Sequence, residues 1–356
     1  MTLKRIVSLL IGCSVSTVLC APSESHVTKV RVGFCARTIS SGAAPFAVAT
    51  RMGWFKEDGI EVNIVPLAGS SDCVKAVATR EITFALAAVE PHAAAVQQGI
   101  KIKTFYTAYQ GNIFGLAVPA DSSIYKVGDM KGKTIGVISM GGGVLFAKAL
   151  AASVGLNPEN DVTFVVVGEG AQTAAIVRSK QVDALSQSDT QFALVENAGV
   201  HLRRLETPQI ARFPGNGFLA LDETLKTHRT EAVALARGYA RGTIFAISNP
   251  EAAVRILYEV FPETRPTGKD EATAIRDDVK VLQARIPNWR LEKSGVSRWG
   301  QSSEANYAEY LDFLLKWGVI GAKVRTEDVI TNDLIDEINR FDTKKIALDA
   351  KAFRAN

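Results

Sequence analysis

The sequence has few of the residues that bind metal ions. Only four histidines occur among its 356 residues, and they are too dispersed for a metal site: His26, His92, His201 and His228. Cysteine is equally scarce, with four residues, two of which fall within the first 20 positions. We therefore expect no metal and no cofactor.

Motifs for nucleotides and for a catalytic serine are missing as well. Gly132-Lys133-Thr134 resembles the end of a phosphate-binding P-loop, but no glycine stands five positions earlier, and the predicted strand follows the motif instead of preceding it. Gly141-Gly142-Gly143 does not match the dinucleotide pattern GxGxxG, and the nucleophile pattern GxSxG does not occur. These absences argue against a nucleotide-dependent enzyme and against a serine hydrolase.

Long apolar runs are absent after the first residues. Lys4 and Arg5 precede a mostly apolar stretch, residues 6–19, that is short for a membrane span. Residues 1–20 are therefore predicted to be an export signal cleaved after Cys20. A second interpretation stays open, because Leu10-Ile11-Gly12-Cys13 resembles a lipoprotein box. The mature protein is expected to be exported, either soluble or tethered by lipid.

An excess of charge of one sign is also lacking. Removal of Lys4 and Arg5 leaves 39 of the 41 basic residues against 37 acidic ones, and the basic residues are scattered. This balance argues against a nucleic-acid partner. Export would permit a disulfide between Cys35 and Cys73, which follow strands expected to be neighbours. Spacing alone does not establish that bond.

What the sequence does contain is a repeated pattern. A strand, a glycine-rich turn and a helix begin at Lys133, and the stretch to Ser188 matches an earlier one at an offset of 100 residues. The matched pairs are Val62 and Val162, Val65 and Val165, Val77 and Val177, Ile82 and Val182, and Phe46 and Phe146. Several matches in one register predict two similar α/β halves.

Strands alternate with helices throughout both halves, which predicts mainly parallel sheets with ligand sites beyond the carboxyl ends of the strands. After Asp222 the pattern is helical in period. Five helices are expected there, over residues 231–247, 250–260, 270–285, 303–317 and 327–341. They are expected to pack back onto the first half.

Several segments resemble the type II periplasmic substrate-binding proteins of ABC importers, the group that binds nitrate, aliphatic sulfonates, taurine, phthalate and thiamine precursors. The segments are Val32-Gly33-Phe34, residues 45–49 (PFAVA), 53–62 (GWFKEDGIEV), 129–137 (DMKGKTIGV), Gly155-Leu156 and 181–184 (QVDA). The resemblance covers nearly all of the mature chain. It implies a periplasmic solute receptor without catalytic activity, a monomer that binds a small-molecule solute and delivers it to ABC transporter permease subunits.

The resemblance further implies two lobes that close on the solute. Lobe 1 is expected to comprise residues 27–115 and 220–341, and lobe 2 residues 120–213. Hinge crossings are expected near 113–119 and 214–219.

Ligand contacts are expected from turns that follow strands, from glycine backbone at helix starts and from aromatic side chains. The candidates are Arg37, Ser40, Ser41, Phe46, Ser70, Ser71, Val89, Glu90, Tyr109, Ser139, Gly141, Gly142, Gly143, Gln187, Asp189, Asn216 and Trp299. For the aromatic candidates, packing in the core is the alternative. Helix N-termini and Arg37 favour an anionic or strongly polar solute. Acids such as Glu90 and Asp189 would instead suit hydrogen-bond donors.

Two other functions stay open. A ligand-binding module of a sensor has the same expected fold. A thiamine-precursor synthase also shares it, but the cysteine cluster of that family is absent here, and an export signal argues against intracellular chemistry.

Overall fold

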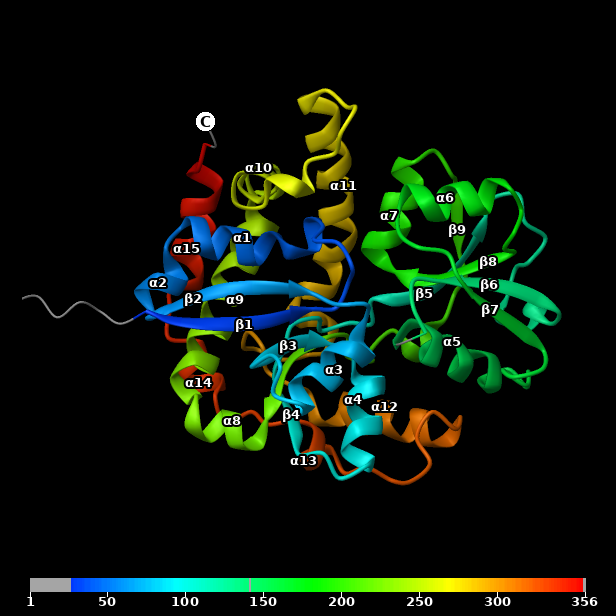
Figure 1. Cartoon of the computed structure of the whole chain (residues 1–356), viewed down its shortest axis with the longest axis horizontal. Coiled ribbons are helices and arrows are strands. Elements are labelled where there is room, and N and C mark those ends of the chain that lie inside the picture. Colours follow the sequence, from blue (N-terminus) through cyan, green and yellow to red (C-terminus); the bar gives the residue numbers. More distant parts are fainter. Residues whose placement is uncertain (1–26, 141, 355–356) are drawn as a thin grey trace, which may run out of the picture.

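The structure is a computed structural model that describes residues 27–140 and 142–354. Within these residues the strands form two five-stranded sheets, each flanked by helices (Figure 1). The first sheet has the spatial order β2 (Ile60–Pro66), β1 (Thr28–Phe34), β3 (Phe84–Ala87), β10 (Gly217–Leu221) and β4 (Ile102–Thr107). The second has the order β7 (Val162–Val166), β6 (Lys133–Val137), β8 (Ala184–Ser188), β5 (Phe114–Pro119) and β9 (Leu202–Arg204).

Both sheets are mixed in the same way. In the first, β1 pairs in parallel with β2 and β3, while β10 is antiparallel to β3 and β4. In the second, β6 pairs in parallel with β7 and β8, while β5 is antiparallel to β8 and β9. Four strands of each sheet thus run in one direction and one runs against them. The prediction of mainly parallel sheets is confirmed.

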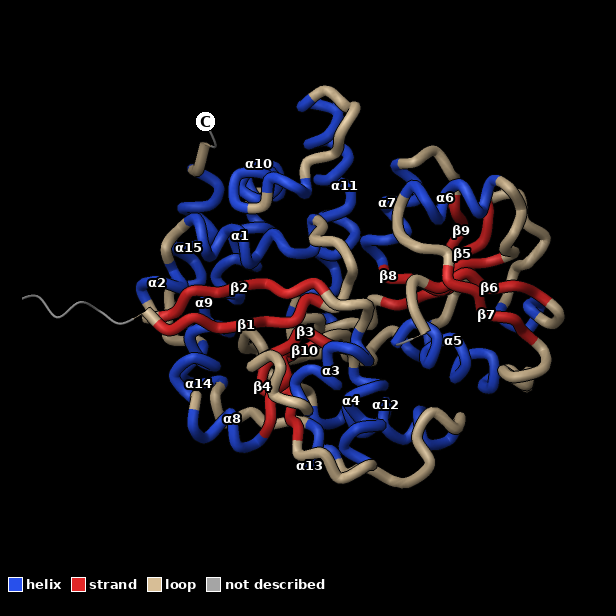
Figure 2. Tube along the Cα trace, in the orientation of Figure 1, coloured by secondary structure: helices blue, strands red, loops and turns tan. Residues whose placement is uncertain are grey.

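Each sheet receives its reversed strand from the other half of the chain. β5 follows β4 of the first sheet but pairs in the second, and β10 follows β9 of the second sheet but pairs in the first. The chain therefore crosses between the sheets in residues 108–113 and returns in residues 205–216, the loops that join the two halves in Figure 2.

The 100-residue repeat is visible in the backbone. Arg80 and Lys180 have the left-handed φ values of 62° and 56°, and Gly99 and Gly199 both have φ of 85°. A left-handed φ is uncommon for a residue with a side chain, so its recurrence at the same offset is specific. The two halves share strand order, strand direction and these turns, which confirms the prediction of similar α/β halves.

Helices cover both faces of the first sheet. One face packs against α1 (Ala44–Arg51), α9 (Arg229–Ser248), α10 (Pro250–Val260), α11 (Glu271–Trp289) and α15 (Thr343–Ala352). The other packs against α3 (Ser70–Ala78) and α4 (Val89–Gln97). α9 packs closely against α1 at Gly242. A Cβ atom at this position would stand only 2.1 Å from the carbonyl oxygen of Pro45. A larger residue at 242 would push the two helices apart.

The second sheet lies between α5 (Gly142–Ser153) on one face and α6 (Ala171–Arg178) with α7 (Asp189–Asn197) on the other. Its apolar cores contain Phe146 and Leu150 of α5, and Val177 and Phe192 on the opposite face. The remaining α-helices are α2 (Trp54–Glu57), α8 (Asp222–Thr227), α12 (Glu304–Lys316), α13 (Thr326–Val329) and α14 (Ile335–Ile338).

Two expectations about the C-terminal region are corrected. The helix predicted over residues 327–341 is broken into α13 and α14, because the backbone N–H of Thr331 donates to the carbonyl of Thr104 in β4 at 2.9 Å and so leaves the helical path. α12 does not pack on the first lobe alone. Its Tyr310 lies in a core shared with β5 and α5 of the second lobe, so this aromatic face joins the two lobes.

A disulfide joins Cys35, just after β1, to Cys73 in α3. The bond closes a loop with a sequence separation of 38 residues. In the chain-entropy description, such a loop stabilises the folded state by about 4 kcal/mol, mainly by restricting the unfolded chain.

We predict that the double substitution Cys35→Ala/Cys73→Ala lowers the free energy of unfolding by about 2–4 kcal/mol. Urea unfolding of the oxidised protein and the variant measures the difference. A reductant should destabilise the wild type and leave the variant unchanged. Equal stability of the wild type with and without reductant would contradict the prediction.

Candidate functional site

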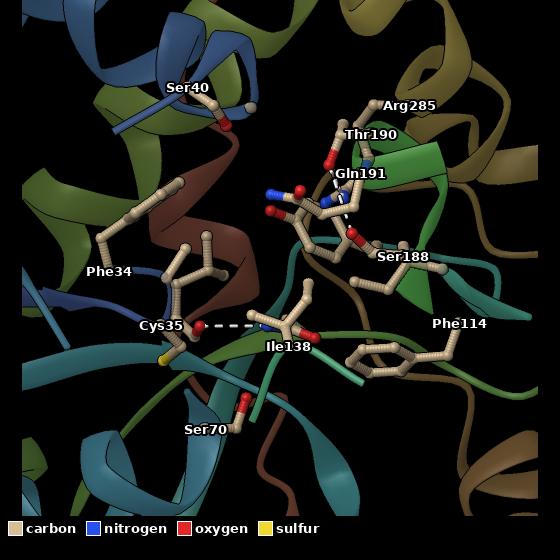
Figure 3. A pocket seen from close by; sticks show the side chains of 16 residues that line it. Phe34, Cys35, Ser40, Ser70, Phe114, Ile138, Ser188, Thr190, Gln191 and Arg285 are labelled. Carbon is tan, nitrogen blue, oxygen red and sulfur yellow. Dashed lines mark hydrogen bonds between the residues drawn. The ribbon is translucent and has the colours of Figure 1, made fainter. Parts of the chain in front are cut away.

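A cavity of about 90 Å³ lies between the two sheets. Its lining comes from segments far apart in the sequence: the ends of β1, β3 and β8, the starts of α3 and α7, both passages between the sheets, and α11. The lining residues are Phe34, Cys35, Ala36, Ser40, Gly42, Ser70, Leu86, Tyr109, Ile113, Phe114, Ile138, Ser188, Thr190, Gln191, Asn216 and Arg285 (Figure 3). The cavity therefore lies beyond the carboxyl ends of the strands, where a ligand site was expected.

Two buried amides of the lining have unused hydrogen-bonding capacity. The Oε1 atom of Gln191 and the Oδ1 atom of Asn216 are buried and have no partner among the described residues. The amide nitrogen of Asn216 donates to the carbonyl of Leu86 at 3.2 Å, which fixes the orientation of that side chain. A buried polar atom without a partner costs about 1–3 kcal/mol, so both oxygens favour a donor in the cavity.

The charged group of the lining, Arg285, is neutralised inside the protein. Its Nε donates to the two oxygens of Asp189 at 2.8 and 2.9 Å, and its terminal nitrogen lies 2.6 Å from Oδ1. Asn288 also donates to Asp189, at 2.9 Å. Burial disfavours the charge of Arg285, but the adjacent carboxylate outweighs this effect and raises the pKa of the guanidinium. The cavity thus contains a cation that adds no net charge.

Aromatic rings supply much of the remaining surface. The guanidinium of Arg285 lies over the ring of Tyr109 at 4.1 Å from its centroid, which holds that ring against the passage between the lobes. Phe34 ends β1 in the first lobe, and Phe114 begins β5 in the second. A flat apolar group in the cavity would therefore meet aromatic carbon from both lobes.

The lobes touch at the rim of the cavity. Glu169 of the second lobe accepts from the backbone N–H of Arg37 at 3.3 Å and from the hydroxyl of Thr38. Ser139 approaches Gly69 so closely that a Cβ atom at 69 would lie 2.5 Å from its hydroxyl oxygen. These contacts describe a closed arrangement of the lobes.

Four of the predicted site residues line the cavity: Ser40, Ser70, Tyr109 and Asn216. Arg37 and Ser71 are exposed outside it, while Ser139 lies at the rim. Gly141 lies outside the described residues. Gly142 begins α5, and a Cβ atom at Gly143 would stand 3.6 Å from the ring of Phe114, behind the cavity wall.

The other candidates do not line the cavity, contrary to expectation, and lie in the core or against other parts of the protein. Phe46 is 1% exposed in the core, with its ring 4.9 Å from that of Tyr239, and Val89 and Ser41 are equally buried. Glu90 is buried against Tyr310 of α12. Gln187 donates to Thr173 at 3.4 Å, and Asp189 holds Arg285. Trp299 packs against the core of the first lobe. Its backbone N–H donates to the side-chain oxygen of Asn339, and its carbonyl accepts from the side-chain nitrogen of the same residue.

The residues that the sequence did not single out include the most informative ones. Thr190 and Gln191 directly follow the predicted Asp189, so the same turn could have identified them. Arg285 lies inside a helix that was expected only to pack, and no local pattern distinguishes it from the other arginines of that region. Phe114 lay in a predicted hinge crossing, residues 113–119, but its position beside the cavity depends on the exchange of strands.

Comparisons with known proteins are consistent with this geometry. Residues 40–253, more than half of the chain, match the protein family described as NMT1/THI5 like. The chain belongs to the NMT1/THI5-like family. Among curated proteins, the riboflavin-binding protein RibY of Chloroflexus aurantiacus is 25% identical over 296 residues, which is 82% of each chain.

Solved structures share the fold of this NMT1/THI5-like protein. A protein of Bordetella bronchiseptica RB50 has a TM-score of 0.68 and 22% identity, covering 91% of this chain and 98% of the other. The nitrate-binding protein NrtA of Synechocystis PCC 6803 has a TM-score of 0.64 at 17% identity, with 88% of each chain covered. The alkanesulfonate-binding protein SsuA of Xanthomonas axonopodis pv. citri, bound to MOPS, has a TM-score of 0.63 at 16% identity, covering 85% of this chain and 98% of the other. The fold is that of periplasmic binding proteins.

Two further observations concern residues 27–140 and 142–354 of this NMT1/THI5-like chain. No group of three or more His, Cys, Asp or Glu side chains is arranged to hold a metal ion there. No helix in that range combines the length and apolar character needed to cross a membrane. The predicted export signal, residues 1–20, lies outside the described residues.

The buried ion pair of Arg285 and Asp189 leads to a testable prediction for this family member. Removing one partner leaves the other charge buried without compensation, which typically costs about 3–5 kcal/mol. We expect Arg285→Met and Asp189→Asn each to lower the free energy of unfolding by about 3 kcal/mol in urea titrations. The double variant should be more stable than the sum of the two losses predicts. Strictly additive losses would contradict a direct pairing.

Two buried titratable residues of α4, Glu90 and His92, predict an unusual pH dependence of the free energy of unfolding. Burial raises the pKa of Glu90 from 4.5 to about 7, against the lowering effect of the hydrogen bond from Tyr310. Burial lowers the pKa of His92 from 6.5 to about 4. The raised value of Glu90 makes stability fall as the pH rises from about 4.5 to 7, because only the unfolded state then loses its proton. The lowered value of His92 makes stability fall as the pH drops from about 6.5 to 4.

Between about pH 4.5 and 6.5 the two effects on stability oppose each other. The substitution Glu90→Gln removes the effect of Glu90, so the pH dependence caused by His92 should become measurable. We expect the variant to gain about 1–3 kcal/mol over the wild type above pH 7. Its stability should also rise with pH between 4 and 6.5, where the wild type changes little. Urea unfolding at several pH values measures both effects, with Glu309→Gln on the exposed face of α12 as the control. Parallel curves for wild type and Glu90→Gln would show that Glu90 does not titrate in this range.

Proposed function

We propose that this protein is an exported solute receptor of an ABC-type importer, which binds a small organic ligand between its lobes and delivers it to a membrane permease. It acts as a monomer and without catalysis. The support comes from the two-lobed fold, from the cavity between the lobes, from membership of the NMT1/THI5-like family, and from the similarity to RibY, which is named for riboflavin binding.

We infer that the ligand is a neutral heteroaromatic compound with amide-like N–H and C=O groups. The observation that carries this inference is the pair of unpartnered amide oxygens on Gln191 and Asn216, set beside the rings of Phe34, Tyr109 and Phe114. A flat heterocycle would satisfy the oxygens with its N–H groups and cover the aromatic faces with its ring. Pyrimidine-like and flavin-like compounds belong to this class.

The geometry gives less support to an anionic ligand than the sequence did. Arg37 is exposed outside the cavity, and Arg285 is already paired with Asp189. The hydroxyl of Ser70, at the start of α3, accepts the backbone N–H of Ala88 at 3.0 Å. An anion would therefore find no unpaired cation in the lining, so a neutral polar solute is the better match.

Binding requires the lobes to separate. The cavity of about 90 Å³ is smaller than the roughly 300–1,000 Å³ of typical ligand pockets. A solute of several rings would have to enter before the rim contacts of Glu169 form. Its contacts to both lobes would then favour closure by its differential affinity for the closed state.

A thermal-shift panel tests the proposal, using the mature chain with riboflavin, an aminopyrimidine, taurine and nitrate. A heterocycle is expected to raise the melting temperature, because a ligand at ~100 times its dissociation constant stabilises the folded state by about 2.7 kcal/mol. Gln191→Leu and Asn216→Leu should each weaken binding roughly tenfold, the value of one good hydrogen bond. Gln181→Leu, at an exposed position of the second lobe, is the matched control.

Stabilisation by taurine or nitrate but by neither heterocycle would refute the proposed ligand class and restore the anion hypothesis. Turnover of the bound compound would refute the receptor and favour an enzyme. Binding that is unchanged in both amide variants would place the ligand elsewhere.

A further inference from the structure

A second pocket lies beside the interlobe cavity, at the hinge. It has a volume of about 340 Å³ and is formed by the two passages between the sheets and by the segment that follows α11. Its lining residues are Asn112, Phe114, Glu206, Thr207, Pro208, Ile210, Ala211 and Lys293. We call it the hinge pocket. Unlike the cavity, it falls within the usual size range of ligand pockets.

The ring of Phe114 separates the hinge pocket from the interlobe cavity, because this residue lines both. The ring is half-buried and lies 6.1 Å from the ring of Phe146 in the second lobe. Phe114 stands at the junction of the first passage and β5, so a separation of the lobes or a change of its rotamer would connect the two spaces. A ligand held in the cavity is thus one side chain away from the hinge pocket.

The hinge pocket offers polar groups of three kinds. The Nδ2 atom of Asn112 is buried without a partner among the described residues, while its Oδ1 accepts from the backbone of Phe114 at 3.0 Å. Glu206 comes from the return passage and Lys293 from the segment after α11. Both side chains are exposed, and neither takes part in a salt bridge among the described residues. Residues that carry an amide donor, a carboxylate and an ammonium group therefore line one pocket.

One wall of the hinge pocket is held firmly. Gln110, two residues before Asn112, donates to the carbonyls of Thr107 and Gln301 at 3.1 and 3.0 Å, and its backbone N–H donates to Asn288 at 2.6 Å. Ser294 donates to the same side chain. These bonds fix the first passage to the segment that carries Lys293.

We propose that the hinge pocket binds a polyhydroxylated chain attached to the heterocycle in the cavity, so that the solute is elongated and spans the two sites. A hydroxyl both donates and accepts, which suits a carboxylate, an ammonium group and an amide donor together. The three groups carry no net charge, and the carboxylate of Glu206 opposes an anionic chain such as a phosphate ester. Pro208 and Ile210 contact the carbon atoms of the chain. This inference rests on the proposed function and specifies its ligand.

The test compares riboflavin, which carries a polyol chain on its tricyclic ring, with lumichrome, the related ring without the chain. Fluorescence titrations of the mature protein are expected to give at least tenfold tighter binding of riboflavin. Lys293→Met and Glu206→Gln should each weaken riboflavin binding about three- to tenfold and leave lumichrome binding unchanged. Lys323→Met, at an exposed lysine outside both pockets, is the control.

The outcomes separate the two proposals. Equal affinity for riboflavin and lumichrome, with no effect of Lys293→Met or Glu206→Gln, overturns the hinge pocket as a subsite while the ring site stands. Weaker binding of both ligands in those variants also overturns it, because a polyol subsite cannot act on lumichrome. If neither ligand binds but another heterocycle without a chain does, the elongated solute is refuted and the receptor function stands. Absence of binding by every heterocycle refutes both proposals.

Discussion

The exchange of one strand between the halves of the chain is the constraint on which the rest of this structure depends. β5 lies between β8 and β9, and β10 lies between β3 and β4, so each exchanged strand is an interior member of the sheet it joins. Neither sheet is complete without a strand that the other half delivers. The two passages must therefore run side by side, and they are bonded to each other, from Gly215 to the carbonyl of Tyr109 at 2.9 Å and from Ala108 to that of Asn216 at 3.1 Å. This hinge places Tyr109 and Asn216 in the cavity and forms the pocket behind Phe114.

Charge compensation shapes the cavity that the hinge creates. Arg285 comes from α11 and Asp189 from α7, and the pair is buried between them. Burying two charges is costly, and this cost is offset only where additional hydrogen bonds complete the pair, as those of Asn288 and Thr190 do here. With its charges paired internally, the lining presents two unpartnered amide oxygens and several aromatic rings.

The two copies of the repeat differ in the residues at the start of their equivalent helices, α4 and α7. α4 and α7 begin at positions 89 and 189. In the first copy this helix start carries Val89 and Glu90; α12 covers it, and the hydroxyl of Tyr310 donates to Glu90. In the second copy it carries Asp189, Thr190 and Gln191, which meet α11 and the cavity. Equivalent backbone thus serves packing in one lobe and lines the cavity in the other, because a different C-terminal helix covers each.

The repeat, the order of strands and helices, and the mainly parallel sheets could be predicted from the sequence, because hydrophobic periodicity and turn residues are local signals. The sequence also located four residues of the cavity, since the turns after strands converge on one edge of a sheet. The disulfide, the break at Thr331, the burial of Glu90 and the role of Arg285 were decided only by the tertiary structure. Each depends on a partner that lies far away in the chain, Cys73 for Cys35, Thr104 for Thr331, Tyr310 for Glu90 and Asp189 for Arg285. Local patterns carry no information about such contacts, because folding alone brings the partners together.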